Sequence, residues 1–241
     1  MNETTIPYAT HTWEPVGSGY DCMLAMDRLR EPESLSDPAR IICCTMADLF
    51  HRHSVPPPSY VDRILTTVAM CPQHRFLWIT DHAANAKAYF DRDVAVALNI
   101  IYGNRGDHST PPPLPLPNLA LLVRTGCRDA FMERVPILRQ TNVAVRGLSC
   151  EPLIEPVADL LDLLGAGDFL DWVTVGGESR STARPCQPDW IEDIWSACRT
   201  AGVPFYFNQW GRNVLRGHPC TAKPAGIMAT RQFPPALEIS Q

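Results

Sequence analysis

Short apolar runs alternate along the chain with longer segments in which apolar residues recur at helical spacing. Residues 40–45 form the first run, and Val61, Ile64 and Leu65 within residues 60–70 fit one helix face, so we predict a strand followed by a helix. The same alternation predicts strands at residues 76–80, 119–123, 143–149, 172–175 and 205–207, and helices at residues 83–90, 93–102, 130–138, 157–164 and 190–201.

Six short apolar strands separated by helices predict an α/β fold in which helices cover a parallel sheet. Hydrophobic periodicity does not distinguish an open doubly wound sheet from a complete or partial (β/α) barrel. Prolines stand at the joints between the periodic segments and indicate one domain, which we place at residues 1–211. Residues 212–241 contain several Pro, Gly and Arg residues and predict an irregular C-terminal extension.

Charge and cysteine usage narrow the functional classes. A net charge of -5 provides no basic field for a nucleic-acid backbone, so a nucleic-acid role would need a local pocket, such as one for a single base. The N-terminus lacks the basic start and apolar core of a secretion signal, and no apolar run approaches the roughly 20 residues of a membrane span. Nine cysteines without a CxxC pair indicate reduced thiols and a cytoplasmic protein.

In parallel α/β folds, ligands bind where the carboxyl ends of the strands and the following loops converge. The polar residues and glycines that follow the apolar runs are therefore our candidates for a functional site. They are Asp48, His51, Asp81, Arg124, Cys150, Glu151, Gly176, Gly177, Glu178, Ser179, Asn208, Gln209 and Trp210, with Arg184 as a partner for one of the carboxylates.

Several candidates also have structural interpretations. Asp48 can cap a turn, and Cys150 can be a small buried apolar residue instead of a nucleophile activated by a histidine such as His51. The pair Gly176 and Gly177 can mark a tight strand exit or a place where a ligand approaches the backbone.

The two glutamates are harder to explain by packing alone. A carboxylate beside apolar strands, such as Glu151 or Glu178, is costly to bury unless it is paired or used. Arg184 can pair with one of them as a structural ion pair, or it can act as an anion clamp.

Four separated segments carry a resemblance to a known family. They read TMADLFH at 45–51, LSCEPL at 148–153, DWVTVGGES at 171–179 and FYFNQWG at 205–211. Over about residues 12–211 the chain resembles the phage gp thirty-seven / gp sixty-eight family, whose members look like radical-SAM proteins. The resemblance implies a partial (β/α) barrel of about six parallel strands, a phage protein in the host cytoplasm, and a four-iron cluster that binds S-adenosylmethionine.

The cysteine motif that such a cluster requires is degenerate in this chain. Residues 12–16 read TWEPV and keep the family's lead-in, but the next loop retains only Cys22, with Gly19 where the family has an earlier cysteine. One thiolate cannot hold a cluster that needs three. Rescue by Cys43 or Cys44 is the alternative, since one of two neighbouring strand residues faces the barrel interior. We therefore expect neither an iron-sulfur cluster nor another metal, and S-adenosylmethionine stays open as a cofactor.

Other family positions at the expected barrel mouth have also changed. Thr80-Asp81-His82 replaces Thr-Lys-Arg, Arg124-Thr125-Gly126 replaces Val-Glu-Asp, and Asn208 replaces a lysine. We therefore expect a diverged function, namely polar chemistry in an enzyme of phage DNA base or nucleotide modification, such as a transferase.

The expected roles follow from residue type. Asp48, Cys150, Glu151 and Glu178 are the expected catalytic groups, and His51, Asp81, Arg124, Gly176, Gly177, Ser179, Arg184, Asn208, Gln209 and Trp210 are expected to bind a DNA base or nucleotide. One alternative is a catalytically inactive relative that binds a partner protein or a nucleotide. The other is a radical-SAM enzyme with unconventional cluster ligands.

Overall fold

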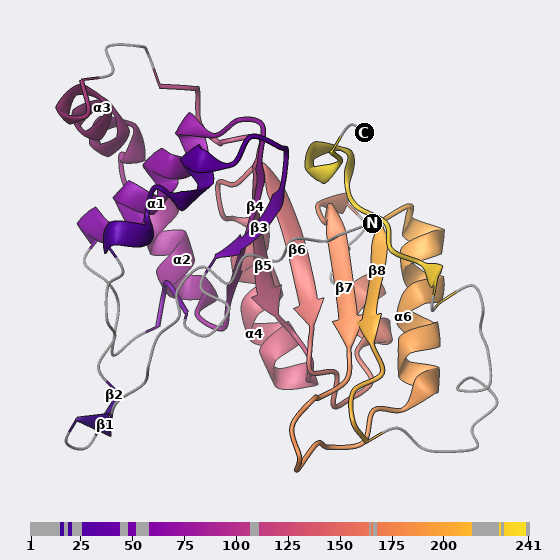
Figure 1. Cartoon of the computed structure of the whole chain (residues 1–241). Coiled ribbons are helices and arrows are strands. Elements are labelled where there is room, and N and C mark those ends of the chain that lie inside the picture. Colours follow the sequence, from indigo (N-terminus) through magenta and orange to yellow (C-terminus); the bar gives the residue numbers. More distant parts are fainter. Residues whose placement is uncertain are drawn as a thin grey trace. The chain divides into compact units, whose positions relative to one another are not determined.

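The computed structural model describes residues 15–16, 19–20, 26–43, 48–51, 58–106, 111–163, 165, 168–213, 227 and 229–239. Its main sheet (Figure 1) contains β3 (Arg40–Cys43), β4 (Arg75–Thr80), β5 (Leu119–Arg124), β6 (Val145–Cys150), β7 (Trp172–Gly176) and β8 (Phe205–Gln209). The α-helices are α1 (Pro58–Met70), α2 (Ala83–Phe90), α3 (Val94–Asn104), α4 (Arg128–Arg139), α5 (Ala158–Leu163) and α6 (Pro188–Ala201). Shorter elements are the hairpin of β1 (Pro15–Val16) and β2 (Gly19–Tyr20), and the 3-10 turns η1 (Met26–Arg28), η2 (Glu31–Ser34) and η5 (Pro235–Leu237).

The strand order settles the question that periodicity left open. The six strands are parallel, and they follow one another in the sheet in the order of the sequence, from β3 to β8. At least one α-helix stands between each strand and the next. A doubly wound sheet would reverse its order at a switch point, whereas the unreversed order is that of a partial (β/α) barrel. The prediction of an α/β fold with six parallel strands is therefore confirmed.

Strands β5 and β7 consist mostly of apolar residues, and they are buried on both faces of the sheet. All five residues of β7 and the first five of β5 are buried, which is typical of parallel strands that have no solvent-facing side. The predicted bounds agree with the observed ones to within a few residues. For example, β6 begins at Val145 instead of residue 143, and β8 ends at Gln209 instead of residue 207. None of the helices among the described residues is long and apolar enough to cross a membrane.

The chain divides into two compact units whose boundary falls within β5. Unit 1 comprises residues 1–121, 141–144 and 237–241, and unit 2 comprises residues 122–140 and 145–236.

In unit 1, a buried histidine links the loop before β3 to the turn before β4. The Nδ1 atom of His74 accepts a hydrogen bond from the backbone N–H of Ala39 over 3.1 Å, and its Nε2 lies 2.9 Å from the carbonyl oxygen of Pro32. Because Ala39 can only donate and Pro32 can only accept, the proton of the neutral ring lies on Nε2. Asn118 stabilises the same region through its side-chain N–H groups, which donate to the carbonyl oxygen of Val68 at the end of α1.

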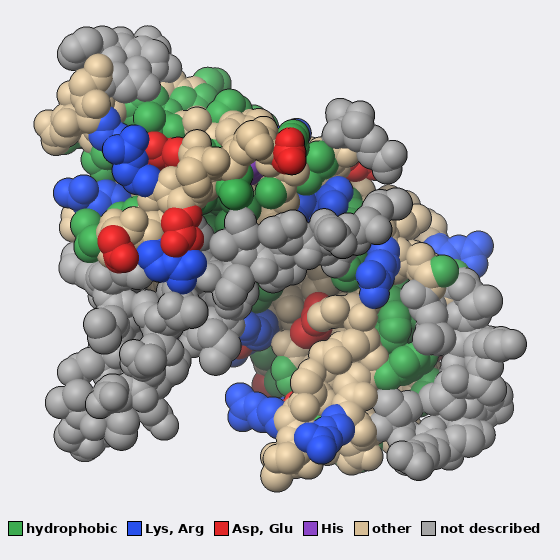
Figure 2. Space-filling view, viewed as in Figure 1, with side chains coloured by type: hydrophobic (Ala, Val, Ile, Leu, Met, Phe, Trp, Pro, Cys, Tyr) green, Lys and Arg blue, Asp and Glu red, His purple; other side chains and the backbone are tan. Residues whose placement is uncertain are grey.

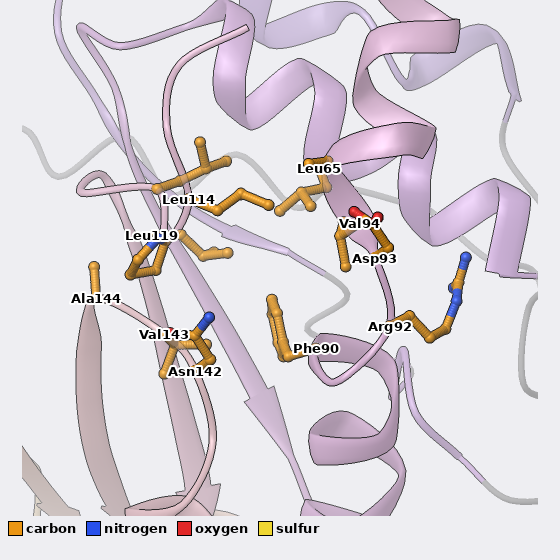
Figure 3. A pocket seen from close by; sticks show the side chains of 13 residues that line it. Leu65, Phe90, Arg92, Asp93, Val94, Leu114, Leu119, Asn142, Val143 and Ala144 are labelled. Carbon is orange, nitrogen blue, oxygen red and sulfur yellow. The ribbon is translucent and has the colours of Figure 1, made fainter.

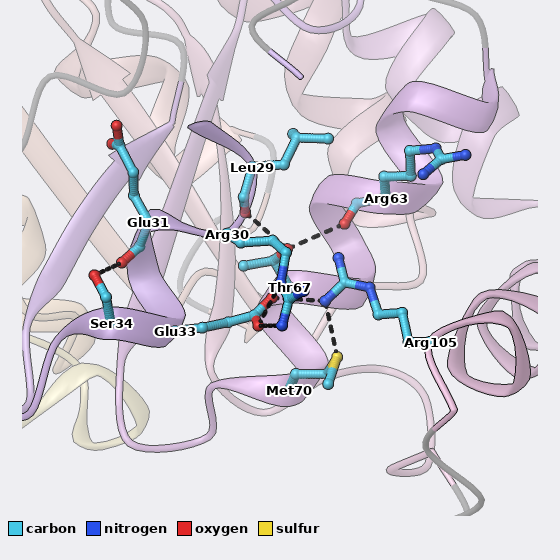
Figure 4. Close-up of polar contacts among 9 residues, drawn as sticks. All are labelled: Leu29, Arg30, Glu31, Glu33, Ser34, Arg63, Thr67, Met70 and Arg105. Atoms are coloured by element: carbon cyan, nitrogen blue, oxygen red, sulfur yellow. Dashed lines mark hydrogen bonds and ion pairs between the residues drawn. The ribbon is translucent and has the colours of Figure 1, made fainter. Parts of the chain in front are cut away.

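A largely buried ion network attaches η2 to the helices of unit 1 (Figure 4). Arg105, just after α3, donates to one carboxylate oxygen of Glu33 over 2.6 Å, and Arg30 pairs with the other over 2.7 Å. Burial opposes the ionisation of Glu33, but the hydrogen bonds from Arg30 and Arg105 outweigh it, so the pKa of Glu33 is lowered. Thr67 of α1 adds a hydrogen bond to the carbonyl oxygen of Leu29 over 2.9 Å.

In unit 2, a C-terminal segment returns to the sheet and covers the outer edge of β8. The backbone N–H of Phe207 donates to Thr230, and that of Gln232 donates to Phe205. The indole N–H of Trp172 also donates to the carbonyl oxygen of Gln232, over 2.9 Å. The segment lies in the predicted irregular extension, and it satisfies backbone groups that would otherwise form an exposed strand edge.

We expect Glu33→Gln to lower the free energy of unfolding by about 1–3 kcal/mol at pH 7, because it weakens charged hydrogen bonds to a largely buried arginine. Since the folded-state pKa of Glu33 is lowered, the ionised network stabilises the fold above the unfolded-state pKa of about 4.3. That contribution is lost as the pH falls through the folded-state pKa. Urea unfolding at pH 7 and at pH 4 should therefore show a smaller gap between wild type and variant at pH 4.

The matched control is Asp91→Asn, which removes an exposed ion pair with Lys87 on α2. Its cost should stay below about 0.5 kcal/mol at both pH values. Equal costs for the two substitutions would contradict the stabilising role assigned to the Glu33 network.

Candidate functional site

Side chains at the carboxyl ends of β6, β7 and β8 divide between the two faces of the sheet. Cys150 of β6 is buried. Burial and then the nearby Cys150 thiol raise the pKa of Cys198 in α6, so Cys150 faces the helices. Strand alternation then turns Glu151, the next residue, to the opposite face. Figure 1 shows these strand ends together at the lower edge of the sheet.

Glu151 and Asn208 form a hydrogen-bonded pair on that face. Nδ2 of Asn208 donates to Oε2 of Glu151 over 2.6 Å, with Asn208 exposed and Glu151 half-buried. Gly176 leaves room for the carboxylate, because a methyl group on its α-carbon would lie 3.1 Å from Oε2. Among the described residues, no partner is recorded for Oε1 of Glu151 or for Oδ1 of Asn208. The pair therefore presents one carboxylate oxygen and one amide oxygen to an incoming molecule.

Asn208 lies at a bulge in β8. Val175 lies opposite Phe207 in the register of β7 and β8, but the next residue, Gly176, lies opposite Gln209. Asn208 is therefore an extra residue on β8. Bulges of this kind redirect a side chain and are frequent next to functional sites.

The loops that follow β7 and β8 lie in backbone contact. The N–H of Gly177 donates to the carbonyl oxygen of Gln209 over 2.9 Å, and that of Arg212 donates to Glu178 over 2.8 Å. A Cβ atom on Gly177 would lie only 2.0 Å from the carbonyl oxygen of Trp210. Of the two interpretations of this glycine, the geometry therefore supports the tight strand exit.

A side-chain hydrogen bond adds to the contact between these loops. Nε2 of Gln209 donates to Oγ of Ser179, and both residues are exposed. Trp210 is half-buried, and its ring lies 4.9 Å from that of Phe207, centroid to centroid. Packing against β8 leaves Trp210 less able to act as a stacking platform for a base.

Glu178 is committed to Arg184. The backbone N–H and the Nε atom of Arg184 lie 3.0 and 2.9 Å from one carboxylate oxygen, and Nη2 lies 3.2 Å from the other. Hydrogen bonds from the side chain and then the backbone of Arg184 lower the pKa of Glu178 to about 2. Glu178 is thus ionised and a weak base near neutral pH, and Arg184 has the geometry of a structural ion pair.

Cys150 has the environment of a buried apolar residue. Its Sγ atom lies 3.5 Å from Oγ1 of Thr125, and burial raises the pKa of the thiol to about 12. A thiol that keeps its proton at neutral pH lacks the thiolate that nucleophilic attack requires.

Arg124 is the last residue of β5 and is half-buried. Its carbonyl oxygen accepts a hydrogen bond from Arg134 of α4 over 2.7 Å. A Cβ atom on Gly147 of β6 would lie 2.8 Å from Leu122, so Leu122 and Gly147 face each other on one side of the sheet. Alternation places the Arg124 side chain on that side with Leu122, and Glu151 there with Gly147.

In unit 1, Asp48 joins the loops after β3 and β4. Its carboxylate accepts hydrogen bonds from Oγ1 of Thr80 over 2.8 Å, from the backbone N–H of Asp81 over 2.7 Å, and from that of Phe50 over 2.9 Å. The rings of His51 and His82 meet edge to face, with centroids 5.0 Å apart. Three donors on one carboxylate correspond to the capping interpretation of Asp48.

Cys43 is the described member of the cysteine pair that could rescue an iron-sulfur cluster. Cys43 is buried and lies in register with Trp78 of β4. Trp78 packs on Phe90 of α2, so Cys43 shares the helix-covered face and does not fit as a ligand inside a barrel. Within the described ranges, no group of three or more His, Cys, Asp or Glu side chains could hold a metal ion. Cys22 and Cys44 lie outside those ranges.

A small cavity in unit 1 lies at the other end of the strands (Figure 3). It encloses about 100 Å³ and is lined mainly by apolar side chains, among them Leu65, Phe90 and Leu119, the first residue of β5. Because catalytic groups of such folds gather at the carboxyl ends of the strands, we place the candidate site at Glu151 and Asn208 instead.

Two arginines that the sequence interpretation missed stand on the loops of the site. Arg180 follows Ser179, and Arg212 follows Gly211, and both are exposed. The sequence signal was a local excess of arginine after the last two strands, which a search limited to the first residues after each strand does not detect.

We expect Gly177→Ala to destabilise unit 2 by about 2 kcal/mol or more, because the new methyl group would overlap the backbone of Trp210. Gly103→Ala is the control, since nothing lies within 4 Å of its Cβ position in α3. That substitution should stabilise the protein by about 0.5–1 kcal/mol. Denaturant unfolding measures both, and a Gly177→Ala variant as stable as wild type would contradict the close approach of the two loops.

Comparison with known proteins gave one match. A family model described as "Protein of unknown function (DUF5131)" matches residues 9–229. No curated protein and no solved structure matched the chain. The matched segment contains all six strands of the main sheet and every candidate site residue. The chain therefore belongs to the DUF5131 family.

Proposed function

We propose that the protein is an enzyme that modifies a nucleobase or nucleotide by polar chemistry, with Glu151 as its acid-base group and Asn208 as its orienting partner. The Glu151–Asn208 pair carries the proposal. Nucleobase edges display hydrogen-bond donors beside acceptors, and enzymes that act on a base read its edge with such side chains. The second carboxylate oxygen of Glu151 accepts a hydrogen bond and the second N–H of the Asn208 amide donates one, so the pair complements such an edge.

Glu151 is the best placed of the predicted catalytic groups. Asp48 already accepts three hydrogen bonds, Glu178 is paired with Arg184, and Cys150 is a buried thiol. Glu151 keeps one carboxylate oxygen without a recorded partner among the described residues. That oxygen can take a proton from an N–H or O–H group of the substrate and return it, as a general base and acid does.

The resemblance to phage radical-SAM-like proteins gives the proposal its setting. In that setting the substrate is a DNA base or nucleotide of a phage pathway, the enzyme a transferase or related modifying enzyme, and the host cytoplasm its location. The degenerate cysteine motif favours polar over radical chemistry. S-adenosylmethionine remains compatible as a donor for polar group transfer.

A catalytically inactive binding protein is the second candidate. The observation that favours it is the commitment of Asp48 and Glu178 to structural hydrogen bonds, which leaves Glu151 as the main chemical group of the described site. Such a protein would bind a nucleotide or a partner protein without turnover.

We expect Glu151→Gln to reduce formation of modified bases by about 100-fold or more, because general acid-base groups contribute about that much. Binding of the substrate should change by less than about tenfold, since glutamine keeps the shape and the contact to Asn208. The measurements are mass spectrometry of DNA and nucleotides from cells that make the protein, and calorimetric titration of the purified protein. Glu133→Gln, at an exposed carboxylate of α4, is the control and should match wild type.

The outcomes separate the two candidates. If the wild-type protein binds a nucleotide through Asn208 but forms no modified base, the protein is a binding protein and not an enzyme. Full modification activity in Glu151→Gln would remove Glu151 from the catalytic role.

A further inference from the structure

The loops after β7 and β8 carry a local positive charge in an acidic chain. Residues 177–187 and 208–213 contain three arginines, Arg180, Arg184 and Arg212, and one acidic residue, Glu178. Their formal charge is therefore +2, from three positive charges and one negative charge, whereas the whole chain carries -5. Figure 2 shows Lys and Arg side chains over the loops beyond the strand ends, at the lower edge of the view.

Glu178 forms an ion pair with only one of these arginines. It binds Arg184 through both carboxylate oxygens. The hydrogen bonds from Arg184 and then the charge of Arg180 lower the pKa of Glu178. The side chains of Arg180 and Arg212 are exposed, and neither guanidinium group has a hydrogen bond or ion pair with a described residue. Two guanidinium groups therefore remain available for an anion outside the protein.

The backbone holds these two arginines on a fixed support. Arg212 donates its own backbone N–H to Glu178, two residues before Arg180. The hydrogen bond from Gln209 to Ser179 and the close approach of Gly177 and Trp210 fasten the same loops. Pre-ordered loops reduce the entropy lost when a ligand binds.

The same support also carries the proposed base site. Asn208 lies four residues before Arg212, and Gly176, beside the carboxylate of Glu151, lies four residues before Arg180. A ligand that reaches from Glu151 to the arginines would need a hydrogen-bonding ring at one end and an anion at the other.

We propose that Arg180 and Arg212 bind the phosphate group of a nucleotide whose base lies at Glu151 and Asn208. This assignment rests on the proposed function and names its substrate class as a phosphorylated nucleotide instead of a free base or nucleoside. Arginine suits the role because its planar guanidinium group donates paired hydrogen bonds to phosphate oxygens. A long duplex is disfavoured as the source of the phosphate by the charge of the whole chain.

Calorimetric titration of the full chain tests the assignment. The ligands are nucleosides, their 5′-monophosphates, inorganic phosphate and a short single-stranded oligonucleotide. We expect a monophosphate to bind wild type at least tenfold more tightly than its nucleoside. Arg180→Ala and Arg212→Ala should each weaken monophosphate binding by about 10- to 100-fold and leave nucleoside binding unchanged. Arg180→Lys and Arg212→Lys should recover part of the loss.

Arg199→Ala is the matched control, because Arg199 is an exposed arginine of α6 that packs over Trp195. It should bind every ligand as wild type does. Both test arginines are exposed, so their variants should unfold at the wild-type temperature.

The two proposals fail separately. Equal affinity for nucleoside and monophosphate would overturn the phosphate site and leave the base site standing. Arginine-dependent binding of inorganic phosphate, without any preference for a nucleotide, would support an anion site and overturn the base site. If the oligonucleotide binds more tightly than the monophosphate, and this binding depends on the arginines, the substrate is a single-stranded nucleic acid and not a free nucleotide.

Discussion

The close backbone contact between the loops after β7 and β8 is the constraint on which the candidate site depends. At Gly177 a side chain would overlap the carbonyl group of Trp210, so this position accepts only glycine without movement of one loop. The contact comes directly after the bulge that adds Asn208 to β8. Tyr206 pairs with Thr174, so strand alternation puts Asn208 on the face of Gly176, where Glu151 lies.

Two of the three predicted catalytic carboxylates have structural roles, and one remains available for chemistry. Asp48 accepts three hydrogen bonds and holds the loops after β3 and β4, and Glu178 holds the loop that contains Arg184. The carboxylate of Glu178, whose pKa the hydrogen bonds from Arg184 lower, stays ionised and is a poor proton acceptor near neutral pH. Glu151 accepts a single recorded hydrogen bond among the described residues, so it keeps the acceptor capacity that catalysis or base recognition needs.

The fold was largely predictable because a buried strand is recognisable as a short run of apolar residues. Residues 119–123 and 172–175 are apolar throughout, and each lies in a strand covered on both faces. The order of the strands was not predictable from periodicity, because it depends on pairing between residues far apart in the chain. The candidate residues were found from their place after the strands, but the partner of each was not.

The side chain of Cys150 shows why the partners escaped prediction. Alternation fixes that Cys150 and Glu151 face opposite ways, but only the packing of α6 shows which of them faces the helices. The Glu151–Asn208 pair joins the ends of two strands that are not neighbours in the sheet, which the apolar pattern does not encode. Arg180 and Arg212 escaped for a different reason, since they follow the strand ends by several residues, on two loops that the backbone hydrogen bond from Arg212 to Glu178 joins.

The negative charge of the whole chain disfavours binding of an anion, whereas the positive charge of the loops favours it. Which effect is larger depends on the distance between the charges and the anion. At physiological ionic strength, exposed charges more than about 8 Å apart are largely screened from each other. The net charge of -5 therefore disfavours a long nucleic-acid backbone, which would meet many parts of the surface, but it has little effect on one phosphate group at Arg180 and Arg212. The carboxylate of Glu151 repels that phosphate if the two lie close together. In the proposed complex, a nucleotide would therefore have one favourable orientation, with its phosphate at the arginines and its uncharged base at Glu151 and Asn208.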